Sequence, residues 1–72
     1  MNEEEMLKIF GENIRKQREK ENITLEEMVK KTKIKKQYLQ KIENGNAAGI
    51  RCSHIFIIAH ALNIKAYKLC EI

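Results

Sequence analysis

The sequence predicts an all-α domain of five helices, and three observations lead to this fold class. The 72 residues contain no proline, a residue that breaks or kinks helices. No segment alternates between apolar and polar residues for long enough to form a pair of strands. Apolar residues instead recur every three or four positions, the spacing that places them on one face of a helix. A chain of this length supports one modest core, so we expect a single domain over residues 1–72.

The first helix is expected from about Glu3 to Glu21. Asn2 can cap its start, and Glu5 occupies the capping-box position three residues later. Arg18 follows the apolar face at its far end. An unpaired arginine at the edge of an apolar face is costly, so a carboxylate elsewhere in the chain is expected to pair with it. The apolar face consists of Met6, Leu7, Phe10 and Ile14.

A second, shorter helix is expected to begin after Thr24 and to end near Thr32 or Lys33. Glu27 follows Thr24 at the spacing of a capping box, in which each side chain satisfies the backbone of the other. Four residues then recur at helical spacing and predict one buried face: Leu25, Met28, Val29 and Thr32.

The third helix is expected from about Lys35 to Asn44, with Gly45 in the left-handed position that commonly ends a helix. Its inward face carries Tyr38, Leu39 and Ile42. Its outward face carries amide and ammonium groups and no acidic residue. The members of that outward face are Lys36, Gln37, Gln40, Lys41 and Asn44.

The last two helices are expected from about Arg51 to Leu62 and from Ala66 to Glu71, the latter with Leu69 inward. Cys52 and Cys70 are the only cysteines, and we expect reduced thiols that pack as small hydrophobic side chains. The inward arc predicted for the fourth helix consists of Cys52, Ile55, Phe56, Ile58, Ala59 and Leu62.

Two features of the middle of the chain predict binding to double-stranded DNA. Only three or four residues separate the second helix from the third, which is the geometry of a helix-turn-helix over about residues 24–44. Residues 30–42 also contain six lysines and no acid, a local cation cluster suited to a polyanion, in a chain of formal charge +4. Glutamine can hydrogen-bond adenine and lysine can donate to guanine in the major groove.

At these residues the chain from Ile9 to Leu69 resembles the Cro/repressor-type helix-turn-helix proteins, the XRE family. The most specific matches are Ile42-Glu43-Asn44-Gly45 and Ile58-Ala59-His60-Ala61-Leu62-Asn63-Ile64. The resemblance implies a five-helix, lambda-repressor-like bundle. It also implies a sequence-specific transcriptional regulator, expected to be a repressor, that reads the major groove with its third helix.

The resemblance further implies roles for individual residues. Arg18 is expected to form an internal ion pair with Glu43. Leu25 and Lys33 depart from the family, which more often has a polar residue and a glycine at these two positions. The expected contacts to base edges are Lys36, Gln37, Gln40 and Lys41. The expected contacts to the DNA backbone are Thr24, Lys33, Lys35, Asn44 and Arg51.

A homodimer is expected because one recognition helix reads only a few base pairs, too few for useful specificity. Ile57 lies opposite the inward arc of the fourth helix, and three further residues lie near the end of the chain. These four form the hypothetical twofold contact: Ile57, Tyr67, Cys70 and Ile72.

Other classes of function are not expected. His54 and His60 lie on different sides of their helix, and no other ligand set has zinc spacing, so we expect no metal, no cofactor and no enzyme activity. The chain has no apolar run or leader of membrane type, so a cytoplasmic protein is expected. Two alternatives to a DNA-binding regulator remain: a protein-interaction module of the same fold, and the antitoxin of a toxin–antitoxin pair.

Overall fold

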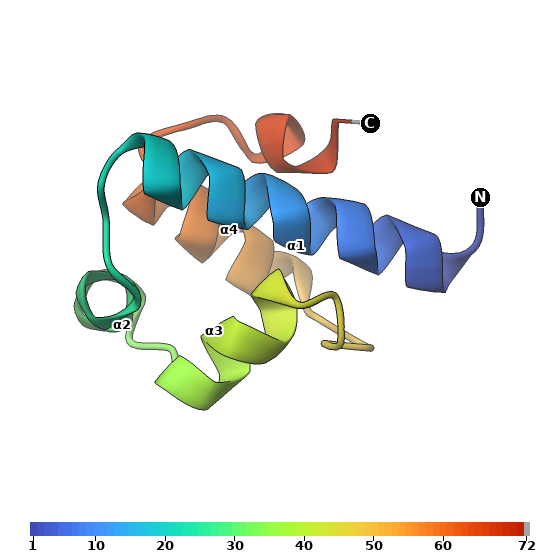
Figure 1. Cartoon of the computed structure of the whole chain (residues 1–72), viewed down its shortest axis with the longest axis horizontal. Helices are drawn as coiled ribbons and strands as arrows, with labels where there is room; N and C mark the ends of the chain where they lie inside the picture. Colours follow the sequence, from blue (N-terminus) through green and yellow to red (C-terminus); the bar gives the residue numbers. More distant parts are fainter. Residues whose placement is uncertain (72) are drawn as a thin grey trace.

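The computed structural model describes residues 1–71, which form four α-helices and one 3₁₀ helix (Figure 1). The helices are α1 (Glu3–Lys20), α2 (Leu25–Thr32), α3 (Lys36–Glu43), α4 (Cys52–Ala61) and η1 (Ala66–Cys70). The predicted all-α class is confirmed. The predicted fifth α-helix is wrong in type, because residues 66–70 form a 3₁₀ helix.

The short length of η1 explains this difference. Its five residues follow Asn63, which has a positive φ of 57°, and it is closed by a bond from Lys68 N–H to the Lys65 carbonyl three residues earlier. A segment this short gains little from the α-helical pattern, and tight i to i+3 turns are common in such pieces.

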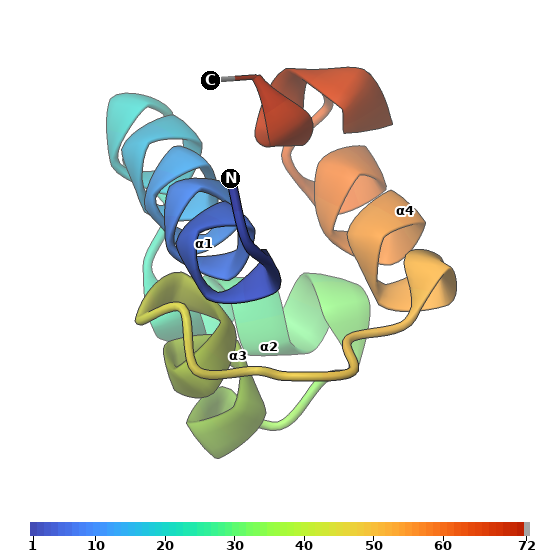
Figure 2. The ribbon, with the colours of Figure 1, turned by 90° about the vertical axis from the view of Figure 1, so that its right-hand side faces the viewer.

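The longest helix, α1, lies between α3 on one side and η1 on the other (Figures 1 and 2). α2 packs against both α3 and α4, and α4 also contacts η1. Every element therefore borders a common interior, and α3 is held between α1 and α2 with its opposite side facing outward.

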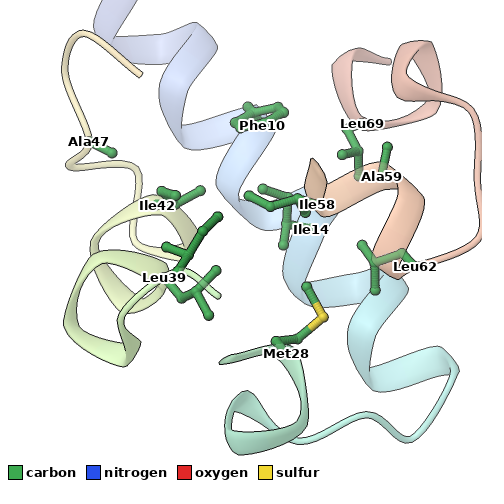
Figure 3. Close-up of a cluster of buried hydrophobic side chains, with 11 residues drawn as sticks. Phe10, Ile14, Met28, Leu39, Ile42, Ala47, Ile58, Ala59, Leu62 and Leu69 are labelled. Atoms are coloured by element: carbon green, nitrogen blue, oxygen red, sulfur yellow. The ribbon is translucent and has the colours of Figure 1, made fainter. Parts of the chain in front are cut away.

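One contiguous core fills that interior, and each element contributes to it (Figure 3). Phe10 of α1 is part of this core. Ile34, in the turn between α2 and α3, is also buried in it and is 8% exposed. Burial of a large aliphatic side chain stabilises a domain by roughly 1.5–3 kcal/mol, so this small set supplies most of the driving force for folding. The largest fully buried side chains are Ile14, Met28, Leu39, Ile42, Ile58 and Leu69.

The inward arc predicted for α4 is correct in part. Ile58, Ala59 and Leu62 are buried, but Phe56 is 65% exposed and Cys52 is exposed as well. The ten residues of α4 are apolar on nearly every side, so their spacing does not distinguish an inner face from an outer one.

Two other burial predictions are wrong. Met6 is 57% exposed, because the first turns of α1 extend beyond the core that Phe10 and Ile14 reach. Cys52 and Cys70 are both free and both exposed, so neither packs as an interior hydrophobic side chain. None of the helices within residues 1–71 combines the length and the apolar character needed to cross a bilayer.

Candidate nucleic-acid interface

Three residues, Lys33 to Lys35, form the turn that sets α3 against α2. Lys33 ends α2 in the left-handed conformation, with φ 62° and ψ 17°, and its N–H donates to the Val29 carbonyl. Thr32 is buried, and its hydroxyl donates to the Met28 carbonyl and accepts from the Ile34 N–H. A lysine in a conformation that favours glycine marks a tight turn, which fixes the angle between the two helices.

The outward face of α3 is exposed along its whole length. Gln37, Gln40, Lys41 and Asn44 are all exposed, whereas Leu39 and Ile42 on the opposite side are each only 1% exposed. A shallow hollow runs beside this face. Amide and ammonium groups therefore project into solvent from a helix whose rotation is fixed by its buried side. The hollow is lined by Lys35, Gln37, Tyr38, Gln40, Lys41, Asn44 and Asn46.

The C-terminal end of α3 is held by a Schellman motif. Asn46 N–H donates to the Lys41 carbonyl, and Gly45 N–H donates to the Ile42 carbonyl. Gly45 has a φ of 77°, and a Cβ at this position would lie 2.8 Å from the Cα of Lys8 on α1. The glycine expected at the helix end therefore also allows α3 to approach α1.

A buried ion pair joins α1 to α3. Arg18 donates from Nε to Oε2 of Glu43 at 2.8 Å and from its guanidinium to Oε1 at 3.1 Å, and it also donates to the Ile23 carbonyl at 2.9 Å. The side chain of Glu43 is 4% exposed and that of Arg18 is 14% exposed. The hydrogen bond to Glu43 raises the pKa of Arg18 above its ordinary value, so the guanidinium stays charged. The structure thus brings together the two residues that the family resemblance paired.

Gly11 permits the same junction, and the sequence reasoning did not single it out. A Cβ at Gly11 would lie 2.7 Å from the carbonyl oxygen of Glu43 and would also collide with the Ile42 carbonyl. The backbones of α1 and α3 therefore touch without an intervening side chain. The sequence did contain a signal, a single glycine within an otherwise good helical sequence. Glycine destabilises the interior of a helix, so its presence there often indicates close packing against another backbone.

Lys36, an expected base contact, is hydrogen-bonded to a residue that the sequence reasoning missed. Its Nζ lies 2.7 Å from Oε2 of Glu26 on α2, with both side chains at least half exposed. The hydrogen bond from Lys36 lowers the pKa of Glu26. An acidic group therefore lies at the N-terminal end of the outward face of α3, and it already pairs with the Lys36 ammonium.

Thr24, an expected backbone contact, is used within the protein. Its hydroxyl accepts from the Glu27 N–H, and its own N–H and hydroxyl both lie 3.1 Å from Oε1 of Glu27. The backbone and hydroxyl hydrogen bonds from Thr24 lower the pKa of the Glu27 carboxyl. The polar groups of Thr24 thus form the capping box that the sequence predicted.

The remaining expected backbone contacts lie around α3. Lys33 and Lys35 are exposed in the turn, and Lys35 directly precedes the first residue of α3. Arg51 is exposed at the start of α4, beyond the loop that crosses the lower part of Figure 2, and it does not line the hollow beside α3. Of these three residues, only Lys35 lines the hollow beside α3, and Lys33 lies two residues before it in the turn.

Three of the four residues expected at the twofold contact lie at the surface of the α4–η1 end. Ile57 is 41% exposed, Tyr67 is 63% exposed and Cys70 is exposed. The fourth, Ile72, lies outside the described residues. Phe56, at 65% exposed, adds to this apolar surface. Cys70 also lines a pocket of about 230 Å³, whose other apolar lining residues are Met1, Met6, Leu7, Ile9, Phe10, Ile50 and Ile55.

The two histidines of α4 have different surroundings. His54 is partly buried, with its ring 5.3 Å from that of Tyr38 in an edge-on arrangement, whereas His60 is exposed. Within residues 1–71, no three side chains of His, Cys, Asp or Glu gather in a group that could hold a metal ion.

Comparison with known proteins finds one matching family and similar solved structures. A model of the helix-turn-helix domain family matches residues 11–71. Two solved structures are similar at 24% sequence identity. The restriction-modification controller protein C.AhdI from Aeromonas hydrophila aligns with a TM-score of 0.82 over 88% of this chain and 94% of its own. The hypothetical transcription factor NHTF from Neisseria aligns with a TM-score of 0.85 over 99% of this chain and 80% of its own. No curated protein sequence matches the chain.

Proposed function

This chain belongs to the helix-turn-helix domain family, and from that premise we propose that it is a sequence-specific DNA-binding regulator that reads the major groove with α3. The family is one of Cro/repressor-type DNA-binding regulators and not of enzymes, so the class assigned from the sequence is confirmed. Repression follows where the bound site overlaps a promoter.

The exposed face of α3 is the observation that carries the proposal. Gln37, Gln40 and Lys41 project from a helix whose other side is buried, and the turn of Lys33 to Lys35 sets that helix out from the body of the protein. A helix held in this way fits the major groove of B-DNA, with its first residues at the base edges.

The chemistry of that face supports reading of bases. The amides of Gln37 and Gln40 can each make two hydrogen bonds to an adenine, and the ammonium of Lys41 can donate to a guanine. Lys36 suits the same role but must share its ammonium with Glu26, from which it is now 2.7 Å distant. Each well-formed pair discriminates against the wrong base by about 1–3 kcal/mol.

Lysines beside the helix are proposed to supply affinity without selectivity. Lys33 and Lys35 are exposed at the leading end of α3 and suit phosphates, whereas Arg51 would reach the backbone only beyond the following loop. Phosphate contacts release counterions, so each one adds about 0.9 to the slope of log affinity against log salt concentration. Thr24 is assigned to the capping box instead.

Two kinds of substitution test this division. Gln37→Ala and Lys41→Ala should each weaken binding to a site selected from random duplex DNA by about tenfold and should barely change binding to random DNA. Lys33→Gly should weaken both about equally and flatten the salt slope by about 0.9. Glycine is chosen because it suits the positive φ of this position, so lost affinity cannot be attributed to strain.

The control is Lys20→Gln, which removes one positive charge from α1 at a hollow shared with His60 and Asn63, away from α3. An unchanged site preference in Gln37→Ala would contradict the assignment of the recognition face. Failure of the wild type to bind random duplex DNA at micromolar protein and low salt would favour a protein-interaction module of the same fold.

We also propose a homodimer in which α4 and η1 form the twofold contact. Phe56, Ile57 and Tyr67 are large apolar side chains between 41% and 65% exposed on neighbouring elements. Contiguous exposed apolar surface is typical of interfaces, and a twofold arrangement places two recognition helices on successive turns of the duplex. Cys70 lies on the same end of the molecule, and Ile72 is kept as part of the proposal.

A further inference from the structure

The start of α2 offers little to a DNA phosphate. The N–H and hydroxyl of Thr24 are directed at Glu27, the next residue is the apolar Leu25, and Glu26 and Glu27 add negative charge to the first turn. A helix N-terminus attracts anions through its free N–H groups, but here one carboxylate already occupies part of that position. If the protein grips the backbone beside α3, another group must do so.

Arg15 on α1 reaches the other end of α3. Its guanidinium donates to Oδ1 of Asn44 at 2.8 Å, and its Nε lies 3.6 Å from Oε1 of Glu43. The Arg15 side chain is 43% exposed, in contrast to the almost buried Arg18. Arg15 is therefore anchored at one edge and open to solvent at the other.

Glu43 is already paired with Arg18, and Arg15 shares a hollow with Glu12 and Glu19, although no ion pair joins Arg15 to either of these two acids within residues 1–71. Arg18 donates two hydrogen bonds to Glu43, so one carboxylate is already matched by one guanidinium. Arg15 adds a second positive charge to the same cluster. A guanidinium carries five N–H donors, and within residues 1–71 those of Arg15 make one hydrogen bond, to Asn44.

Asn44 connects this cluster to the recognition face. One hollow is lined by Arg15, Arg18, Leu25, Gln40, Glu43 and Asn44, and the hollow beside α3 also includes Gln40 and Asn44. Because Oδ1 of Asn44 accepts from Arg15, the amide is oriented with its NH₂ group directed away from that bond. Arg15 and Asn44 thus present N–H donors side by side at the edge of the reading surface.

We propose that Arg15 contacts a DNA backbone phosphate and holds Asn44 in place to donate to the same phosphate. The pair would take over the role that the start of α2 gives up, and it would fix the C-terminal end of α3 against the duplex. A guanidinium suits this task because its planar fork matches two phosphate oxygens. This inference rests on the proposed function and specifies a part of it.

The test measures binding of the full chain to a random-sequence duplex of about 24 base pairs between 50 and 200 mM salt. Arg15→Gln should weaken binding about fivefold at 100 mM and flatten the salt slope by about 0.9, the value for one lost phosphate contact. The matched control, Lys20→Gln, removes the same charge from the same helix and should leave the slope within about 0.3 of wild type.

A second variant, Arg15→Lys, tests the proposal independently of whether Arg15→Gln folds. Arg15→Lys keeps the charge but loses the fork, so it should keep the wild-type slope while its affinity falls about threefold. In addition, Asn44→Ala should cost much less in the Arg15→Gln background than in the wild type, because the two side chains act on one phosphate.

Each outcome is decisive. Equal slopes for Arg15→Gln, Lys20→Gln and wild type would overturn the inference while leaving DNA binding intact. Additive effects of the Arg15 and Asn44 substitutions would overturn the shared phosphate. If the wild type binds DNA at no salt concentration, the inference and the proposed function are both overturned. This outcome is distinct from the others because the wild type then gives no salt slope.

Discussion

The junction between α1 and α3 and the end formed by α4 and η1 are built on opposite principles. At the junction two backbones touch at Gly11, a buried carboxylate is paired with Arg18, and the helix end is closed at Gly45. At the other end Phe56 and Tyr67 are mostly exposed, and the free, exposed thiols of Cys52 and Cys70 lie on the same two elements. The first region has a specific partner for each group, whereas the second leaves apolar surface without one.

This difference assigns separate tasks to the two regions. The junction determines where α3 stands, because neither a shift nor a rotation is possible without breaking a backbone contact or the ion pair of Arg18 and Glu43. The buried core residues at the α4–η1 end are Ile58, Ala59, Leu62 and Leu69. Its outer side is therefore free to serve the proposed second subunit. Substitutions at the junction should destabilise the fold, and those at the α4–η1 end should alter assembly.

The largest effect is expected from Gly11→Ala. The new methyl group would lie 2.7 Å from a backbone oxygen of Glu43, which cannot move away as a flexible side chain could. We expect a loss of about 4 kcal/mol in the free energy of unfolding, measured by urea denaturation. The control is Gly49→Ala, where a Cβ meets nothing within 4 Å and only the positive φ of 75° is unfavourable, at about 1 kcal/mol. Equal losses would mean that the helices do not touch at Gly11.

Glu43→Gln should have the next largest effect. It leaves the Arg18 guanidinium, at 14% exposed, without its counter-charge, and we expect a loss of about 3 kcal/mol in unfolding free energy. The control is Glu12→Gln, whose pair with Lys16 at 3.5 Å is well exposed and should contribute less than about 0.5 kcal/mol. Similar losses in the two variants would contradict a buried pair at the junction.

Acid should destabilise the α2–α3 part of the molecule. Hydrogen bonds from Thr24 and Lys36 lower the pKa values of Glu27 and Glu26 below the ordinary value of 4.5. A lowered pKa in the folded state gives stability that is complete above pH 4.5 and is lost as the pH falls through the folded-state value. Urea midpoints measured from pH 7 to pH 3 should therefore fall less steeply in Glu27→Gln than in wild type. Parallel curves would show that the capping box does not persist in solution.

The smallest effect on the monomer is expected from Ile57→Asp. The side chain is 41% exposed, so the unfolding free energy of a dilute sample should change by less than about 0.5 kcal/mol. Sedimentation at high protein concentration should nevertheless show a monomer, because a charge at the proposed twofold contact cannot be buried against its own copy. The control is Gln37→Asp, which places a charge at an exposed position on the outward face of α3, outside the proposed contact, and should remain dimeric. A monomeric wild type would contradict the proposed contact.

The sequence was sufficient for elements whose signals are local. Asn2, Thr24 with Glu27, and Gly45 all act at helix ends as their types and spacing predicted, because a cap depends only on residues within one turn. The outward face of α3 was also predictable, since a short helix with three large apolar residues can bury only one side.

Features that depend on tertiary approach were not predictable in the same way. Phe56 was assigned inward because α4 is apolar on nearly all sides, and only its packing against α2 and η1 decides which residues are buried. The contact of Lys36 with Glu26 joins residues ten positions apart on two helices, and the anchoring of Arg15 by Asn44 spans 29. No local pattern encodes these distances.

Titration of isotope-labelled protein with duplex DNA, followed by amide chemical shifts, compares the two regions most directly. Binding through the outward face of α3 should give the largest shift changes at residues 33–46 and around Arg15, with little change on the outer side of α4 and η1. If the largest shift changes instead occur at Phe56, Ile57 and Tyr67 and α3 is unaffected, binding of DNA through α3 is contradicted.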